Sequence, residues 1–206
     1  MNYAITSNHT HLLLKVRRPA RVSVFMRQLE GEFAAHYNRR KQRRGAFWSE
    51  RYHATVIEDG CHLWNCMYYI DLNMVRAGVV DHPAQWRWCG YQEISIRRER
   101  YRILDLRELV GTAAMSDLRA FNAWYETGLN ETLRTASGQR EPHWTESIAV
   151  GSHEFVERFT VLSKSRRNFE FGESADGVWY VRESRETYRR RRITARKKRK
   201  GALDSK

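Results

Sequence analysis

Cysteine is scarce in this chain, and its few positions argue against two classes of small protein. Cys61, Cys66 and Cys89 are the only cysteines in 206 residues, an odd number without a Cys-x-x-Cys spacing. A disulfide framework needs paired cysteines, and a cysteine zinc site needs closely spaced ones. The sequence also lacks an apolar run long enough to span a bilayer and a signal-peptide pattern at its start. We therefore expect a cytoplasmic protein without a membrane partner.

Acidic residues are also outnumbered, 24 Asp and Glu against 37 Lys and Arg, which gives a formal net charge of +13. Such an excess indicates a polyanionic partner, most commonly nucleic acid. Nine of the basic residues lie within 189–200, so the rest of the chain carries only +4. We expect a mildly basic folded body and a basic tail that attracts nucleic acid without reading its sequence.

The hydrophobic pattern predicts a mixture of short strands and helices. Alternating residues around a Ser7-Asn8 turn indicate a β-hairpin, and a later apolar stripe has helical spacing. Asp59 is a plausible N-cap for a second helix, which Gly78 would end. The expected strands are 2–6, 9–16 and 47–57, and the expected helices are 20–41, 59–77, 103–110, 117–130 and 146–163. Residues 165–186 are polar with few apolar anchors.

Two histidines close to the start give the first indication of chemistry. His9 and His11 are two residues apart in a predicted strand, so both imidazoles would lie on the same face. A pair of neighbouring imidazoles can bind a metal ion or flank a phosphate. Taken alone, the pair is more often an ordinary feature of a strand.

The second predicted helix supplies matching chemistry. Tyr69 and Asn73 are four residues apart and would share one helix face. A tyrosine hydroxyl can act as a nucleophile, and an asparagine oxygen is a suitable ligand for a hard cation. Together with the histidine pair, they predict a phosphoryl-transfer site. Tyr68 is a rival nucleophile without this spacing, and Asp71 could be a solvated carboxylate with no catalytic role.

Three spaced motifs resemble one known family. They are Asn-His-Thr-His-Leu-Leu-Leu at 8–14, Phe-x-x-x-Arg-Tyr-His at 47–53, and Tyr-Ile-Asp-Leu-Asn-Met-Val-Arg-Ala-Gly at 69–78. In this order they are similar to the REP-associated tyrosine transposases, which belong to the HUH-type single-tyrosine transposases. The resemblance covers about residues 1–92.

The resemblance implies a metal site and a reaction. His9, His11 and Asn73 would bind Mg²⁺ or Mn²⁺, and Tyr69 would attack a phosphate of single-stranded DNA. The metal would polarise that phosphate, and a 5′-phosphotyrosine link would form that a 3′-hydroxyl later reverses. The implied function is a metal-dependent transposase and single-strand DNA endonuclease. It would cleave and rejoin single-stranded hairpin (REP-type) DNA in DNA transposition, in association with the nucleoid.

The family also implies an α+β fold, with a ferredoxin-like antiparallel sheet and packed helices. Family members have a strand and a helix before the histidine strand, whereas this chain begins at that strand. We expect a catalytic domain over 1–95, a helical extension over 96–165, and a polar linker with a basic disordered tail over 166–206. Related enzymes occur as monomers and as dimers, so both oligomeric states stay open.

Basic and aromatic side chains provide candidates for DNA contact. Phosphate-binding candidates at the end of the first helix and beyond are Arg39, Arg40, Lys41, Arg43, Arg44 and Arg51. The first five could equally be a solvated helix end that complements the helix dipole. Candidates for stacking on unpaired bases are Trp48, Trp86, Trp88 and Tyr91. Such aromatic clusters more often belong to a core.

Two other functions stay open at this point. The first is a catalytically inactive DNA-binding remnant of such a transposase, suggested by the missing strand and helix. The second is a basic RNA-binding protein in which the histidine pair is incidental. The second alternative explains the basic tail but not the spacing of Tyr69 and Asn73.

Overall fold

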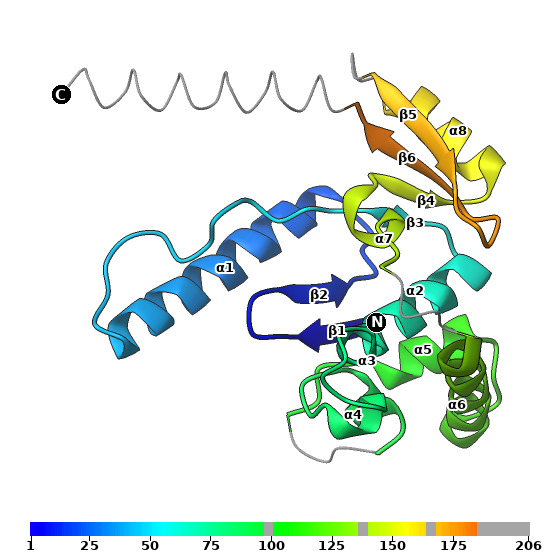
Figure 1. Cartoon of the computed structure of the whole chain (residues 1–206), viewed down its shortest axis with the longest axis horizontal. Coiled ribbons are helices and arrows are strands. Elements are labelled where there is room, and N and C mark those ends of the chain that lie inside the picture. Colours follow the sequence, from blue (N-terminus) through cyan, green and yellow to red (C-terminus); the bar gives the residue numbers. More distant parts are fainter. Residues whose placement is uncertain (97–100, 136–139, 164–167, 185–206) are drawn as a thin grey trace. The chain divides into compact units, whose positions relative to one another are not determined.

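The computed structural model in Figure 1 shows an α+β protein with antiparallel strand pairing, which confirms the expected fold class. The structure describes residues 1–96, 101–135, 140–163 and 168–184. The chain forms two compact units. Unit 1 consists of residues 1–53 and 70–135, and unit 2 consists of residues 54–69 and the described part of 136–206. The two units alternate along the chain, whereas the sequence suggests consecutive domains.

Unit 1 is mainly helical and contains one β-hairpin. Its elements are β1 (Asn2–Ile5), β2 (Thr10–Leu13), α1 (Ala20–Arg40), α3 (Asn73–Arg76), the 3₁₀ helix η1 (Pro83–Gln85), α4 (Tyr91–Ile94), α5 (Leu106–Thr112) and α6 (Leu118–Thr135). Helix α2 (Cys61–Asp71) crosses from unit 2 into unit 1. The elements of unit 2 are β3 (Val56–Ile57), α7 (His143–Glu146), β4 (Ala149–Gly151), α8 (His153–Leu162), β5 (Phe169–Glu173) and β6 (Trp179–Glu183).

The predicted N-terminal hairpin is confirmed. Strands β1 and β2 pair antiparallel around the Ser7-Asn8 turn, with Ala4 opposite His11. The segment before α4 covers the other edge of β1, because the amide of Ile5 donates to the Trp88 carbonyl at 2.9 Å. The hairpin is therefore held on one side by a later part of unit 1. Strand β2 ends at Leu13, three residues earlier than expected.

A buried carboxylate joins the hairpin to the helices of unit 1. Asp71 is 2% exposed and accepts hydrogen bonds from Asn2 Nδ2 at 3.1 Å and from the Tyr125 hydroxyl at 2.7 Å. Burial raises the pKa of Asp71 to about 7, although these hydrogen bonds oppose the shift. The interpretation of Asp71 as a solvated carboxylate is therefore wrong. Its role in unit 1 is to satisfy polar groups inside the core.

Helix α1 has the predicted length but not the expected burial. Its apolar stripe suggests a face packed into the core, yet none of its residues is buried. Phe25 is 45% exposed, Leu29 41% and Phe33 46%. After α1 the chain returns along the helix as an irregular segment (Figure 1). Much of the apolar face is therefore not covered by the described residues.

The strand expected over 47–57 is largely wrong, since only Val56–Ile57 is a strand. Two aromatic residues in this range pack on α1 instead of pairing with a strand. The ring centroids of Phe47 and Trp48 lie 5.0 and 5.7 Å from that of Phe33. Aromatic residues favour strands only where a neighbouring strand is available to pair with them.

The second predicted helix is divided into two. Helix α2 ends at Asp71 and α3 begins at Asn73, with Leu72 at φ −81° and ψ 2° between them. Tyr69 and Asn73 therefore lie on successive helices. Gly78 ends the helical segment as predicted, with a φ of +66° that suits glycine.

Unit 2 is a four-stranded sheet of order β3-β4-β6-β5 with α8 packed against it. Ala149, Val156 and Val181, all fully buried, form the centre of its core. The helix expected over 146–163 is interrupted by β4, after which Ser152 caps α8 by accepting from the Phe155 amide at 3.2 Å.

The β5–β6 hairpin is a second feature of unit 2 that differs from the sequence prediction. Its two strands pair antiparallel from Phe169 opposite Glu183 to Glu173 opposite Trp179. The expectation of a disordered linker is therefore wrong for residues 169–183, where alternating apolar residues pair across a glycine turn at Gly177. The expected basic tail over 189–200 lies outside the described residues.

Candidate active site

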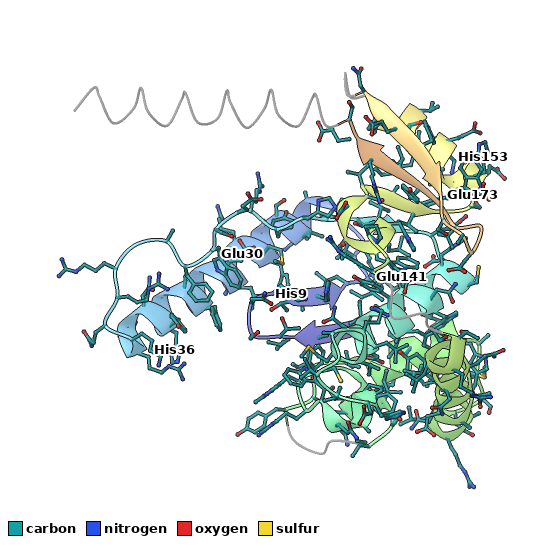
Figure 2. The ribbon with its side chains drawn as sticks, in the orientation of Figure 1. His9, Glu30, His36, Glu141, His153 and Glu173 are labelled. Atoms are coloured by element: carbon teal, nitrogen blue, oxygen red, sulfur yellow. The ribbon has the colours of Figure 1, made fainter. Side chains whose placement is uncertain are left out.

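The two histidines lie next to each other in unit 1. His9 immediately precedes β2 and His11 lies within it, and their ring centroids are 4.9 Å apart in an edge-to-face arrangement. His9 stands near the turn of the hairpin (Figure 2). The predicted proximity of the two imidazoles is therefore present, because the short strand carries both side chains at one end of the hairpin.

The turn before β2 orients the His9 ring. Nδ1 of His9 lies 2.7 Å from Oδ1 of Asn8 and 3.1 Å from the Thr6 hydroxyl. The amide oxygen of Asn8 can only accept, so Nδ1 carries a proton, and in the neutral imidazole the lone pair is on Nε2. A histidine held in this tautomer presents Nε2 to a ligand. Asn8 and Thr6 belong to the predicted turn, and the sequence analysis did not assign them this role.

His11 faces Asn73 across unit 1. Nδ2 of Asn73, the first residue of α3, lies 3.1 Å from Nε2 of His11. Burial, with smaller electrostatic contributions from His9 and Arg76, lowers the pKa of His11 to about 4. The imidazole is therefore neutral at physiological pH, and its Nε2 accepts the hydrogen bond from the Asn73 amide.

Tyr69 belongs to the part of α2 that is assigned to unit 2. It is 7% exposed, and its ring centroid lies 6.1 Å from that of Trp144 with the planes tilted by 37°. Tyr68 is equally buried at 6%. The structure thus brings His9, His11 and Asn73 together within unit 1 and places Tyr69 in the aromatic packing of unit 2. The contact with Trp144 could not be found from local spacing.

The predicted phosphate-binding cations lie at the end of α1 and in the returning segment. The five around the end of the helix, Arg39, Arg40, Lys41, Arg43 and Arg44, are all exposed. The guanidinium groups of Arg40 and Arg43 lie 5.9 and 5.8 Å from the Tyr37 ring centroid. That of Arg51 lies 5.7 Å from the ring of its neighbour Tyr52. Cation–π contact accounts structurally for part of this cluster.

The four aromatic candidates for base stacking differ in their surroundings. Tyr91 is 6% exposed and is a core residue. The indole nitrogens of Trp86 and Trp48 each donate to a backbone carbonyl, at 3.0 and 2.9 Å. Trp88 is exposed, and the guanidinium of Arg87 lies 4.3 Å from its ring centroid. Trp48 is therefore a half-buried ring that a hydrogen bond holds in place, and it lies in the basic stretch 39–51.

The candidate metal site does not consist of histidine, cysteine and carboxylate side chains alone. Within the described ranges, no group of three or more His, Cys, Asp or Glu side chains could hold a metal ion. The candidate set contains two histidines and one asparagine amide. Its nitrogen atoms and amide oxygen suit Mn²⁺ and, less strongly, Mg²⁺.

Comparison with known proteins finds one family that is similar to this region. The family described as IS200-like transposase matches residues 1–73. The match covers 73 of the 206 residues, and over this span the chain is similar to the IS200-like transposases. This span contains all four predicted catalytic and metal-binding residues, from His9 to Asn73, and is consistent with the resemblance to REP-associated tyrosine transposases. No curated protein and no solved structure matches the chain.

The similarity of residues 1–73 to the IS200-like transposases supports a transposase-like function with DNA as the partner. Transposases of this family generally use a divalent metal. In the described part of the chain, no helix is both long and apolar enough to cross a membrane.

Proposed function

We propose that this chain cleaves and rejoins single-stranded hairpin DNA of the REP type through a 5′-phosphotyrosine intermediate on Tyr69. The family match of residues 1–73 supports a transposase. The observation that carries the finer proposal is the approach of Asn73 Nδ2 to His11 Nε2 at 3.1 Å, because it brings a predicted third ligand to the histidine pair.

The two histidines can bind a divalent metal as they stand, whereas Asn73 must first rotate its amide. His9 keeps Nε2 available through its contacts at Nδ1, and His11 is neutral because its pKa is lowered to about 4. Asn73 would contribute its amide oxygen after rotation about χ2. When bound, a divalent cation polarises the phosphate and stabilises the leaving oxygen.

The chain supplies the nucleophile and the means of holding DNA. The Tyr69 hydroxyl would lose its proton to solvent as its oxygen attacks phosphorus, and the bond from phosphorus to the 3′ oxygen would break. The 3′ oxygen would take up a proton from solvent and leave as a 3′-hydroxyl. Arg39, Lys41 and Arg44, which have no ring contact among the described residues, are proposed phosphate contacts. Because Tyr69 is 7% exposed, its hydroxyl must become accessible before attack.

The same burial favours a second candidate function. A nucleophile packed beside Trp144 suits a protein that binds DNA but has lost cleavage, which is the catalytically inactive remnant considered above. The two functions share the DNA-binding surface of unit 1. They differ in whether Tyr69 can reach a phosphate.

The proposal is tested by trapping the covalent intermediate. Single-stranded hairpin oligonucleotides with a short randomised flank and a 3′ fluorescent label are incubated with protein and Mn²⁺ or Mg²⁺, then separated by denaturing gel electrophoresis. We expect a labelled protein band that is absent with EDTA and with fully duplex DNA of the same sequence. DNA binding without any such band under every metal condition would reject cleavage and favour the inactive remnant.

A further inference from the structure

A groove runs between α1 and the segment that returns along it, and both sides belong to unit 1. It encloses about 630 Å³ and opens to solvent. Its α1 side consists of Ser23, Val24, Arg27, Glu30, Gly31 and Ala34, and its other side consists of Gly45, Ala46, Phe47, Trp48, Arg51 and Tyr52. We call it the α1 groove. Figure 2 shows Glu30 part-way along the helix.

Hydrogen bonds fix two aromatic rings of the α1 groove. The Trp48 indole N–H donates to the Glu30 carbonyl at 2.9 Å, and the hydroxyls of Tyr52 and Ser23 lie 2.8 Å apart. Trp48 is also supported from the side, because the Phe47 ring meets it edge-to-face at 4.8 Å. A ring fixed in this way is a preorganised stacking surface, since little side-chain entropy is lost when a ligand binds.

One residue of the α1 groove is a glycine that faces open space. Gly31 lies in the middle of a 21-residue helix, where glycine is unfavourable relative to alanine by about 1 kcal/mol. A Cβ atom at this position would meet no other atom within 4 Å, so packing does not require the glycine. A residue that violates helix propensity without a packing reason indicates a functional constraint.

The charge around the α1 groove indicates what binds there. Arg27 and Arg51 line it and are exposed, and Glu30 is its acidic lining residue. Neither arginine is in an ion pair within the described ranges. Residues 39–51 contain six Lys and Arg and one acidic residue, Glu50. Aromatic rings interleaved with cations are the pattern that holds single-stranded nucleic acid, with bases on the rings and phosphates on the cations.

We propose that the α1 groove binds unpaired bases of single-stranded DNA, with one base stacked on Trp48 and the flanking phosphates at Arg27 and Arg51. This rests on the proposed function, because it names where the unpaired flank of the DNA substrate is held. The residues that carry it are separate from the histidine pair and from Tyr69. The α1 groove thus determines affinity for unpaired DNA and not the chemistry of cleavage.

The test fills the α1 groove and measures binding without metal. Fluorescence anisotropy with an oligo-dT of about twelve nucleotides reports affinity in EDTA. Gly31→Phe should weaken binding by roughly tenfold to a hundredfold, the effect of losing a stacked base. Gly111→Phe is the matched control, because Gly111 is also helical and exposed, and a Cβ atom there would likewise meet no other atom within 4 Å. This control should bind as the wild type does.

Two further comparisons separate stacking from charge alone. Oligo-dT should quench tryptophan emission in the wild type, and Trp48→Phe should lose most of that quenching. Replacing Arg27 and Arg51 by Gln should weaken binding more than the equal charge change at Arg119 and Arg134. Wild-type affinity in Gly31→Phe, equal affinity for a blunt duplex, or tighter binding of oligo-U than of oligo-dT would each overturn the proposal.

The alternative occupant is a second copy of the chain, and sedimentation velocity distinguishes it. If Gly31→Phe converted a dimer into a monomer, the α1 groove would be a dimer interface and the proposal would be wrong.

The oligo-dT binding test is also independent of catalysis. Loss of oligo-dT binding in Gly31→Phe supports the α1 groove even if the wild type forms no covalent adduct, whereas an adduct with unchanged oligo-dT binding rejects it.

Discussion

Nδ2 of Asn73 lies 3.1 Å from Nε2 of His11, although the two residues are 62 positions apart in the sequence. The contact joins the start of α3 to the middle of β2 within unit 1. It is the structural basis for the proposed metal site, since rotation about χ2 would bring the Asn73 amide oxygen to the position beside His11 Nε2.

Removing the Asn73 amide should disable the proposed site. We expect Asn73→Ala to reduce the rate of adduct formation by about tenfold or more, because the variant lacks one metal ligand. Asn73→Asp keeps an oxygen at the same position and should stay within a few-fold of the wild type. Rates come from quantified denaturing gels. Asn130→Ala, an exposed asparagine on α6, is the control. An unchanged rate in Asn73→Ala would remove this residue from the site.

The orientation of His9 can be tested through its neighbour. Asn8→Ala removes the acceptor at 2.7 Å from Nδ1, so the ring can change its tautomer and direction. We expect Mn²⁺ to bind roughly tenfold to a hundredfold more weakly, as for other residues that orient a metal ligand. Titration followed by electron paramagnetic resonance measures the free ion. Ser7→Ala, an exposed change in the same turn, should have no effect. Equal affinity in both variants would show that Asn8 does not orient the ligand.

The buried Asp71 should make stability depend on pH in an unusual direction. Its pKa is about 7 in the folded protein and about 3.9 when unfolded, so between these values the folded state holds the extra proton. The free energy of unfolding should therefore fall as pH rises from about 4 to about 7, by at most about 1.4 kcal/mol per pH unit from this group.

Urea unfolding of Asp71→Asn against the wild type measures this contribution. The amide cannot ionise, so the stability of Asp71→Asn relative to the wild type should increase steadily with pH over that range. Asp81→Asn changes an exposed carboxylate and should follow the wild-type curve. Parallel pH profiles for Asp71→Asn and the wild type would show that Asp71 ionises normally in the folded state.

Salt dependence should separate the structural from the DNA-binding cations. Arg40 and Arg43 lie against Tyr37, so among the five cations at the end of α1 we expect Arg39, Lys41 and Arg44 to contact phosphates. Replacing these three by Gln should lower the slope of log affinity against log salt by about 0.7 for each phosphate of a single strand that is no longer neutralised. The control removes equal charge elsewhere, at Arg107, Arg119 and Arg134. If both triple variants changed the slope equally, the cluster would act only through net charge.

Local pattern was sufficient for those elements whose signals are local. The Ser7-Asn8 hairpin, the span of α1 and the end at Gly78 follow from alternation, helical spacing and turn chemistry. The pairing of His9 with His11 follows from the same alternation. The three family motifs identified the residues of the proposed site. The IS200-like transposase family matches residues 1–73, a span that contains these residues.

Features that depend on distant contacts could not be predicted. The interruption at Leu72 and the burial of Asp71 arise from packing and from partners up to 69 residues away, and neither has a local signature. The packing of Tyr69 beside Trp144 joins segments 75 positions apart. The apolar face of α1 was predicted from amphipathic spacing, but its exposure was not. Spacing shows that a helix has an apolar face and does not show what covers that face.

The most direct test of the proposed mechanism is to identify the residue that carries the DNA. The adduct from hairpin DNA and Mn²⁺ is digested with trypsin and nuclease, and the modified peptide is mapped by mass spectrometry in wild type, Tyr69→Phe and Tyr68→Phe. We predict a nucleotide phosphate on Tyr69 in the wild type and in Tyr68→Phe, and no adduct in Tyr69→Phe. An adduct that persists in Tyr69→Phe, or a phosphate mapped to Tyr68, would contradict the proposed mechanism.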